Sequence, residues 1–189
     1  YESSFIVFRK DTDKAVSEGC NYPEKSVLAT FDTPWTVAFQ EKRGGPEAPV
    51  TFDTLYDWTT SDDLRIKYFS GDATYTNSFK LKKLPQGEVY VDLGKAMVMA
   101  KVKVNGEYAG GVWTAPYRLN ITNLLRKGVN TIEVEVVNCW RNRVIGEKEA
   151  IPANERFTFQ TATYLNKDSE LQPSGLLGPV ELQIYDYGK

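Results

Sequence analysis

Apolar and polar side chains alternate with a period of two along several stretches of this 189-residue chain. In the stretch 131–137, Ile132, Val134 and Val136 alternate with Glu133 and Glu135. Successive side chains of a β-strand point to opposite faces of the sheet, so the pattern indicates strands with one buried face and one solvated face. Parallel sheets show continuous apolar runs separated by long helices instead. We therefore predict an all-β chain, an antiparallel β-sandwich of jelly-roll type, whose alternating stretches are 74–81, 88–93, 98–104, 131–137 and 180–184.

Turn signals separate the predicted strands. Asn105-Gly106 supplies two residues that tolerate positive φ, the strongest short-range signal for a two-residue hairpin turn. A single helical turn is predicted at 122–126, with Thr122 as its N-cap and Gly128 ending it in a left-handed conformation. Before residue 66 the pattern is weaker, and it predicts strands at 5–8, 27–31 and 35–40 and a short helical piece at 54–58.

The length fits one well-cored domain, because a chain of this size buries about 70% of its unfolded surface. We predict a single β-sandwich domain over 1–189, with an N-terminal strand and loop at 1–26 and the sandwich proper at 27–187. The chain begins at Tyr1 rather than Met, which indicates an excised or processed fragment.

The amino-acid composition excludes several kinds of catalytic and metal site. The chain contains no histidine, which excludes Ser-His-Asp triads, Cys-His pairs and imidazole metal sites. Its net charge of −2 gives no basic footprint for nucleic acid, and no apolar run has the 18 or so residues of a membrane span. Cys20 and Cys139 fit no metal spacing; they form either a disulfide or two separate thiols.

A set of short motifs carries a resemblance to known families. One group resembles the galactose-binding-like, sugar-binding jelly-roll domain of family 2 glycoside hydrolases: Leu93-Gly94, Val104-Asn105-Gly106, Gly111-Val112-Trp113, Pro116-Tyr117, Ile121-Thr122, Gly128 and Asn130. A second group is similar to the C-terminal region of family 106 enzymes, the α-L-rhamnosidase type of Bacteroidetes: 66–71, 140–146 and 174–180, with 35–37 and 57–59. The motifs are specific as a set and weak singly.

The resemblance implies a role more than a reaction. In family 106 the chemistry belongs to a barrel domain N-terminal to this region, and such a barrel alone needs about 250 residues. The implied function is a non-catalytic accessory module that packs on the catalytic domain of the same polypeptide and contributes to carbohydrate binding in polysaccharide degradation. The implied location is the periplasm, the cell surface or outside the cell, with no cofactor. Glu147 departs from the family pattern, which has an aspartate at this position.

Two aromatic groups are candidate sugar-binding residues. Trp140-Arg141-Asn142-Arg143 follows the predicted strand at 131–137. A Trp face stacks on sugar C–H groups, while Arg and Asn bind hydroxyls. The alternative is a structural corner in which Arg143 bonds loop carbonyls. Trp113 and Tyr117 follow a glycine pair that permits close approach, and their alternative is an aromatic cluster at the sandwich edge. Glu147 completes the candidate set, and Trp58 and Tyr68 are expected to be core or domain-contact residues rather than ligand platforms.

Catalysis by carboxylates is the weaker alternative. A glycosidase needs two carboxyls about 5 to 9.5 Å apart, and the available acids sit in no recognisable motif. A bound calcium has no Asp-x-Asp-x-Asp-Gly loop to hold it, although loop oxygens hold one in related sandwiches. Three hypotheses remain open: the accessory module, an autonomous carbohydrate-binding module, and a small glycosidase or lyase using some of Asp53, Asp57, Asp62, Asp63, Glu147, Glu149, Glu155 and Glu170.

Overall fold

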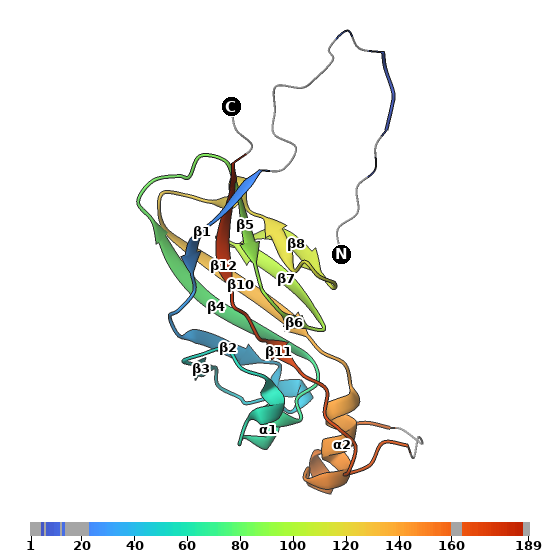
Figure 1. The fold of residues 1–189 in the computed structure, drawn as a ribbon. Helices are drawn as coiled ribbons and strands as arrows, with labels where there is room; N and C mark the ends of the chain where they lie inside the picture. The colour runs from blue at the N-terminus through green and yellow to red at the C-terminus, as the bar shows by residue number, and fades with distance from the viewer. Residues whose placement is uncertain (1–4, 6, 12, 14–22, 160–163, 187–189) are drawn as a thin grey trace.

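Two antiparallel sheets face each other and enclose the main core (Figure 1). The computed structural model describes residues 5, 7–11, 13, 23–159 and 164–186. The smaller sheet has the order β1 (Glu24–Thr30), β12 (Glu181–Asp186), β5 (Glu88–Asp92) and β9 (Arg118–Asn120). The larger sheet has the order β3 (Val50–Phe52), β2 (Trp35–Phe39), β4 (Asp72–Leu81), β10 (Gly128–Val137), β7 (Met99–Val104) and β8 (Glu107–Val112). A small ribbon pairs β11 (Gly175–Leu176) with β6 (Ala96–Met97).

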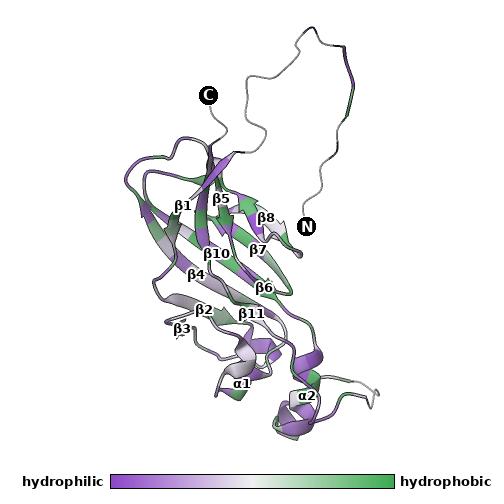
Figure 2. Cartoon of the chain, in the orientation of Figure 1, coloured by the Kyte–Doolittle hydropathy of each residue, from purple (hydrophilic) through white to green (hydrophobic). Residues whose placement is uncertain are grey.

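The predicted alternation matches the burial of the central strands. β10 pairs with β4 on one side and β7 on the other, so that Val134 lies opposite both Tyr75 and Val102. All three side chains are fully buried, whereas the polar partners on the other face are partly or fully exposed. Figure 2 shows the resulting alternation of green and purple along the strands. The all-β sandwich prediction is confirmed.

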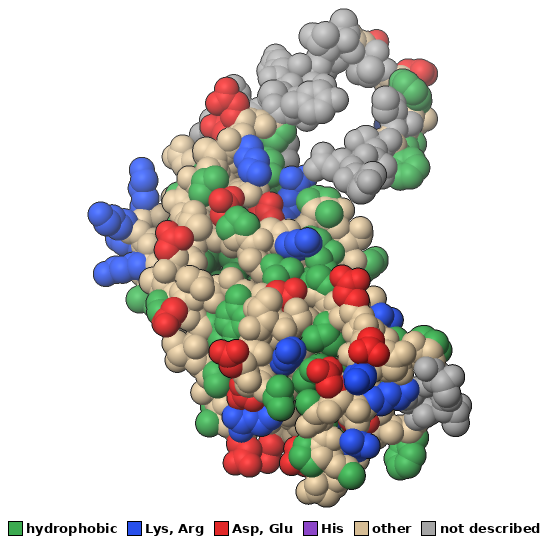
Figure 3. Space-filling view, turned by 60° about the horizontal axis from the view of Figure 1, so that its bottom comes forward, with side chains coloured by type: hydrophobic (Ala, Val, Ile, Leu, Met, Phe, Trp, Pro, Cys, Tyr) green, Lys and Arg blue, Asp and Glu red, His purple; other side chains and the backbone are tan. Residues whose placement is uncertain are grey.

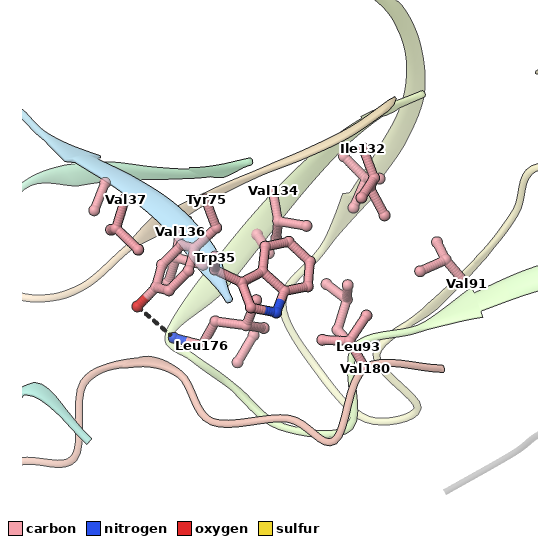
Figure 4. Packing of buried hydrophobic residues seen from close by; sticks show 14 of the residues in the cluster. Trp35, Val37, Tyr75, Val91, Leu93, Ile132, Val134, Val136, Leu176 and Val180 are labelled. Carbon is pink, nitrogen blue, oxygen red and sulfur yellow. Dashed lines mark hydrogen bonds between the residues drawn. The ribbon is translucent and has the colours of Figure 1, made fainter. Parts of the chain in front are cut away.

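Side chains from both sheets meet in the main core, which is rich in aromatic residues (Figure 4). Trp35 packs edge-on against Tyr75 with ring centroids 6.3 Å apart. The Tyr75 hydroxyl accepts hydrogen bonds from Trp58 Nε1 at 2.6 Å and from the Leu176 amide at 3.2 Å. These bonds satisfy polar groups that would otherwise be costly to bury. Trp58 is fully buried in this core, and Tyr68 is buried in a second apolar cluster, so the core alternative holds for both residues.

The predicted hairpin and the helical turn beside it are both present. Asn105 and Gly106 have φ values of 54° and 83° and join β7 to β8. The helical turn is shorter than predicted, a 3₁₀ turn η3 (Thr122–Leu124). Thr122 is its first residue rather than its cap, because its Oγ1 accepts a hydrogen bond from the Val89 amide at 2.8 Å.

Short helical elements gather beyond one end of the larger sheet, and α2 (Arg141–Glu149) lies there next to α1 (Leu64–Lys67) (Figure 1). The helical piece predicted at 54–58 begins only at Trp58, because the Asp57 side chain caps η2 by accepting from the Thr59 amide at 3.0 Å. The nine-residue helix α2 was not predicted at all. These elements are η1 (Glu41–Arg43), η2 (Trp58–Thr60), α1 (Leu64–Lys67), α2 (Arg141–Glu149) and η4 (Ala153–Glu155).

Other predictions need correction. The strand predicted at 5–8 is wrong for its described residues: Phe5, Val7 and Phe8 lie outside strands and are exposed. Val98 does not continue the buried face of β7, since the strand begins at Met99. Cys139 is a free thiol whose Sγ donates to Gln172 Oε1 at 2.9 Å. Cys20 lies outside the described residues.

The surface is mixed in charge. On the face shown in Figure 3, acidic and basic side chains are interspersed with separate apolar patches. Within the described ranges, no helix combines the length and the apolar character needed to cross a membrane.

Candidate functional site

Helix α2 is unusual because it is polar in sequence yet largely buried. Figure 2 shows it mostly purple, although the run 142–147 is buried throughout. Val144 and Ile145 of this helix belong to a second apolar cluster, separate from the main core, with Tyr68, Ile151 and Leu165. Buried polar groups require hydrogen-bond partners, and those of α2 come from distant segments of the chain.

The central feature of α2 is a buried ion pair. Arg143 Nε donates to Glu147 Oε1 at 2.9 Å, and the two side chains are only 4% and 6% exposed. Arg143 Nη2 also donates to the Glu155 carbonyl at 2.6 Å, and its guanidinium lies 4.1 Å from the Phe157 ring centroid. All sides of Arg143 are thus occupied by groups of this chain.

The Glu147 carboxylate organises the segment that follows η4. It accepts hydrogen bonds from the Phe157 amide at 3.0 Å and from both the amide and the hydroxyl of Thr158. Burial raises the pKa of Glu147, but the bonds from Thr158, Phe157 and Arg143 outweigh it, so the pKa lies below its ordinary value. The carboxylate is therefore held ionised.

Asn142 and its neighbours attach α2 to the segment before β11. Asn142 Nδ2 donates to the Gln172 carbonyl at 2.7 Å and to Ser174 Oγ at 3.0 Å, while its Oδ1 accepts from the Gln172 amide at 2.8 Å. Arg141 Nε donates to the Glu170 carbonyl at 3.1 Å. These contacts support the structural-corner interpretation for Asn142 and Arg143.

Trp140 stands at the start of α2 with 43% of its surface exposed. The Arg43 guanidinium lies 4.9 Å from its ring centroid, and Phe157 packs edge-on at 5.9 Å. A hollow of about 340 Å³ opens on one side, lined by Trp140, Arg43 and Phe159 among others. A second hollow of about 340 Å³ lies on its other side and is lined by Trp140, Tyr164 and Leu165 among others. We call the surface formed by Trp140, Arg43, Phe157, Phe159 and Tyr164 the α2 face.

The structure divides the predicted sugar-binding residues between two places. Trp140, Arg141, Asn142, Arg143 and Glu147 are together on α2 or at its start. Trp113 and Tyr117 lie far from them, in the connection between β8 and β9 (Figure 1).

Their exposures also differ. Trp113 is 73% exposed, contrary to the edge-cluster alternative, and Tyr117 is half-buried against the main core. Trp140 is open to a ligand or a partner, while Asn142, Arg143 and Glu147 are buried and bonded internally.

The other residues of the α2 face were not predicted. Arg43 lies in 41–49, where Gly44, Gly45, Pro46 and Pro49 indicate a connection. Phe157, Phe159 and Tyr164 lie in a region without strand or helix periodicity. The repeated aromatics at 157 and 159, two residues apart, were the one available signal.

Several of the candidate acids have structural partners. Asp57 caps η2 and accepts from the Ser174 amide at 3.0 Å. Asp63 caps α1 and pairs with Arg65, whose hydrogen bonds lower the pKa of Asp63. Glu149 accepts from the Tyr68 hydroxyl at 2.9 Å. In the part of the chain that the structure describes, no three His, Cys, Asp or Glu residues cluster as a metal site would require.

Comparison with known proteins places this geometry in context. No family model matches the chain. A rhamnosidase from Novosphingobium sp. PP1Y superposes with a TM-score of 0.85 and 38% identity over 93% of this chain, but over only 16% of its own length. The chain corresponds to one part of a larger glycoside hydrolase.

A sequence relative agrees with that match. A "Putative beta-glucuronidase" from Formosa agariphila is 37% identical over a match that covers 71% of this chain and 14% of the relative. The chain thus spans about one sixth or less of the proteins that it matches at this identity. A β-glucuronidase from Ruminococcus gnavus shares the fold at 18% identity and a TM-score of 0.59.

Proposed function

We propose that this chain is a non-catalytic accessory β-sandwich of a larger α-L-rhamnosidase-type hydrolase, galactose-binding-like in kind and located in the periplasm or at the cell surface. The observation that carries the proposal is the coverage: 93% of the chain matches 16% of a rhamnosidase at 38% identity. An accessory domain is expected to match a small share of the enzyme that contains it over nearly its own full length, as this chain does.

The α2 face is the surface that we propose packs on the catalytic domain. It carries exposed aromatic side chains, Phe159 at 102% and Tyr164 at 76% exposure, beside the half-exposed Trp140. Contiguous exposed apolar surface commonly marks an interaction site. The Arg143–Glu147 pair beneath it holds the backbone of this surface in place, which suits a preorganised contact.

Hydrogen exchange tests this packing. The amides of 153–159 are compared between the 189-residue chain and the full polypeptide encoded by its reading frame. We expect slower exchange of these amides in the full polypeptide, while the amides of the β7–β8 hairpin serve as a control and do not change. Equal exchange in both forms would refute packing through the α2 face.

A second function, an autonomous carbohydrate-binding module, is favoured by the exposed Trp113. An exposed indole offers a flat apolar face for a sugar ring. Titration calorimetry of the 189-residue chain with rhamnose, galactose and pectic oligosaccharides tests it. Binding that is lost in Trp113→Ala supports this function, and silence across the panel leaves only the packing role.

A further inference from the structure

Basic side chains gather at the end of the sandwich that lies away from α2, where β4 turns into β5 and β10 begins (Figure 1). The segments 78–87 and 122–130 contain no Asp or Glu, although the whole chain has 25 acidic residues against 23 basic ones. Figure 3 shows basic side chains projecting at the left edge, on the side where these connections lie in Figure 1. We call this surface the basic end, and its basic residues are Lys80, Lys82, Lys83, Arg126 and Lys127.

Strand pairing brings the two segments of the basic end together. Leu81 lies opposite Gly128 in the β4–β10 ladder, so the basic pair 82–83 leaves one strand where the pair 126–127 enters the other. All the basic residues of this end are exposed, and within the described part of the chain none of them forms an ion pair. Like charges held together without internal counterions repel one another, and an anionic partner relieves that repulsion.

A buried amide holds the backbone beneath these charges. Asn130 is fully buried, and its Nδ2 donates to the Arg126 carbonyl at 2.8 Å and to the Gly128 carbonyl at 3.2 Å. Its Oδ1 accepts from the Arg126 amide and from Asn105 Nδ2, both at 2.9 Å. The connection into β10 is therefore fixed before any partner arrives, which lowers the entropy lost on binding.

The side chains among the lysines indicate the kind of anion. Leu84 and Val129 are 53% and 54% exposed, so apolar surface stands between the charges. The one aromatic residue of the two segments is Phe79, which packs against the main core and offers no stacking platform for a sugar ring or a base. Four of the five cations are lysines, which act as point charges toward phosphate rather than as bidentate forks.

We propose that the basic end docks on an anionic lipid surface, with its Lys and Arg side chains on headgroup phosphates and Leu84 entering the apolar boundary. A lipid surface uses both the charges and the exposed apolar groups, as amphipathic membrane-binding surfaces do. An acidic protein surface would use the charges alone. The α2 face lies at the other end of the sandwich, so docking on lipid leaves that face free (Figure 1). The proposal goes beyond the accessory role and does not depend on it.

Co-sedimentation with vesicles tests the proposal. The 189-residue chain is mixed with vesicles of equal parts phosphatidylglycerol and phosphatidylcholine, and separately with phosphatidylcholine alone. We expect binding to the anionic vesicles and at least about tenfold weaker binding to the neutral ones. Raising NaCl from 0.1 to 1 M shortens the screening length from about 10 to about 3 Å, so it should release most of the bound protein.

A triple variant locates the contact at the basic end. Each Lys or Arg near an anionic membrane strengthens binding about fivefold. Lys82→Gln/Lys83→Gln/Lys127→Gln is therefore expected to weaken binding to the anionic vesicles about a hundredfold. All three side chains are exposed, and an unchanged urea midpoint shows that the variant folds.

The matched control removes the same charge from exposed lysines outside the basic end, Lys42→Gln/Lys95→Gln/Lys167→Gln. It changes the net charge equally, so an effect of net charge alone would weaken both variants to the same extent. We expect the control to lose less than about fivefold in binding.

Leu84→Ser separates a lipid surface from an acidic protein surface. About half of the Leu84 side chain is available for burial, so the substitution should weaken binding to the anionic vesicles about three- to tenfold. Three results would overturn the inference: equal binding to both kinds of vesicle, equal losses in the triple variant and its control, or no effect of Leu84→Ser. The last would leave a contact made by charge alone, as an acidic protein surface provides.

Discussion

Replacing Glu147 by Gln tests how the α2 face is built. The substitution keeps the shape of the side chain and one acceptor oxygen, but it leaves the charge of Arg143 buried without its counterion. Breaking a buried ion pair in this way costs about 3–5 kcal/mol. Arg143 keeps its bond to the Glu155 carbonyl and its contact with Phe157, so we expect the lower end, about 3 kcal/mol.

Urea and thermal unfolding of the 189-residue chain measure this loss. For a chain of this size 1 kcal/mol corresponds to about 2–4 °C, so the melting temperature should fall by about 6–12 °C. Glu149→Gln on the same helix is the matched control: Glu149 is exposed and Gln can still accept from Tyr68, so we expect a change below about 1 kcal/mol. Equal stability of the two variants would refute the reasoning.

The pH dependence gives an independent check on Glu147. Although burial raises its pKa, the hydrogen bonds lower it below the ordinary 4.5. A lowered folded-state pKa means that the stabilisation is present above the unfolded pKa and is lost as pH falls through the folded pKa. The free energy of unfolding should therefore decline below about pH 4.5, and less steeply in Glu147→Gln than in the unsubstituted chain. Identical slopes would contradict this account.

Three further outcomes are expected. Burial, together with Glu149, raises the pKa of Tyr68 to about 12, so its ¹³Cζ resonance should titrate near that pH, and its stabilisation should be complete below pH 10 and lost as pH rises through 12; titration near 10 would contradict this. Gly146→Ala should destabilise by about 1–3 kcal/mol in thermal unfolding despite the better helix propensity of Ala, because the added Cβ would lie 2.6 Å from Tyr68 Cβ; a gain in stability would show that the helix can shift. Trp58→Ala should cost about 3–5 kcal/mol and Trp113→Ala less than about 0.5 kcal/mol in urea unfolding, since the first is fully buried and the second 73% exposed; similar losses would contradict the assigned core.

The strands were predictable because their signal is local. Each central strand carries its own alternation, and a one-residue shift would expose the whole buried set, as the pairing of Val134 with Tyr75 and Val102 illustrates. The Asn105-Gly106 turn was predictable for the same reason, because two adjacent residues supply the required positive φ.

The α2 face was not predictable, because its stability depends on partners far away in the chain. The sequence of α2 has no apolar stripe, and Asn142, Arg143 and Glu147 are buried only because segments 153–158 and 170–174 bring backbone donors and acceptors to them. The strand predicted at 5–8 rested on a short apolar run alone. Its described residues Phe5, Val7 and Phe8 are exposed, so this local signal did not lead to burial.

The most direct test of the central claim is hydrolysis of an aryl α-L-rhamnoside by the 189-residue chain, measured beside the full polypeptide encoded by its reading frame. The accessory role predicts turnover by the full polypeptide and none above buffer by the isolated chain. Turnover by the isolated chain that is abolished when one of its own carboxylates is replaced would contradict it.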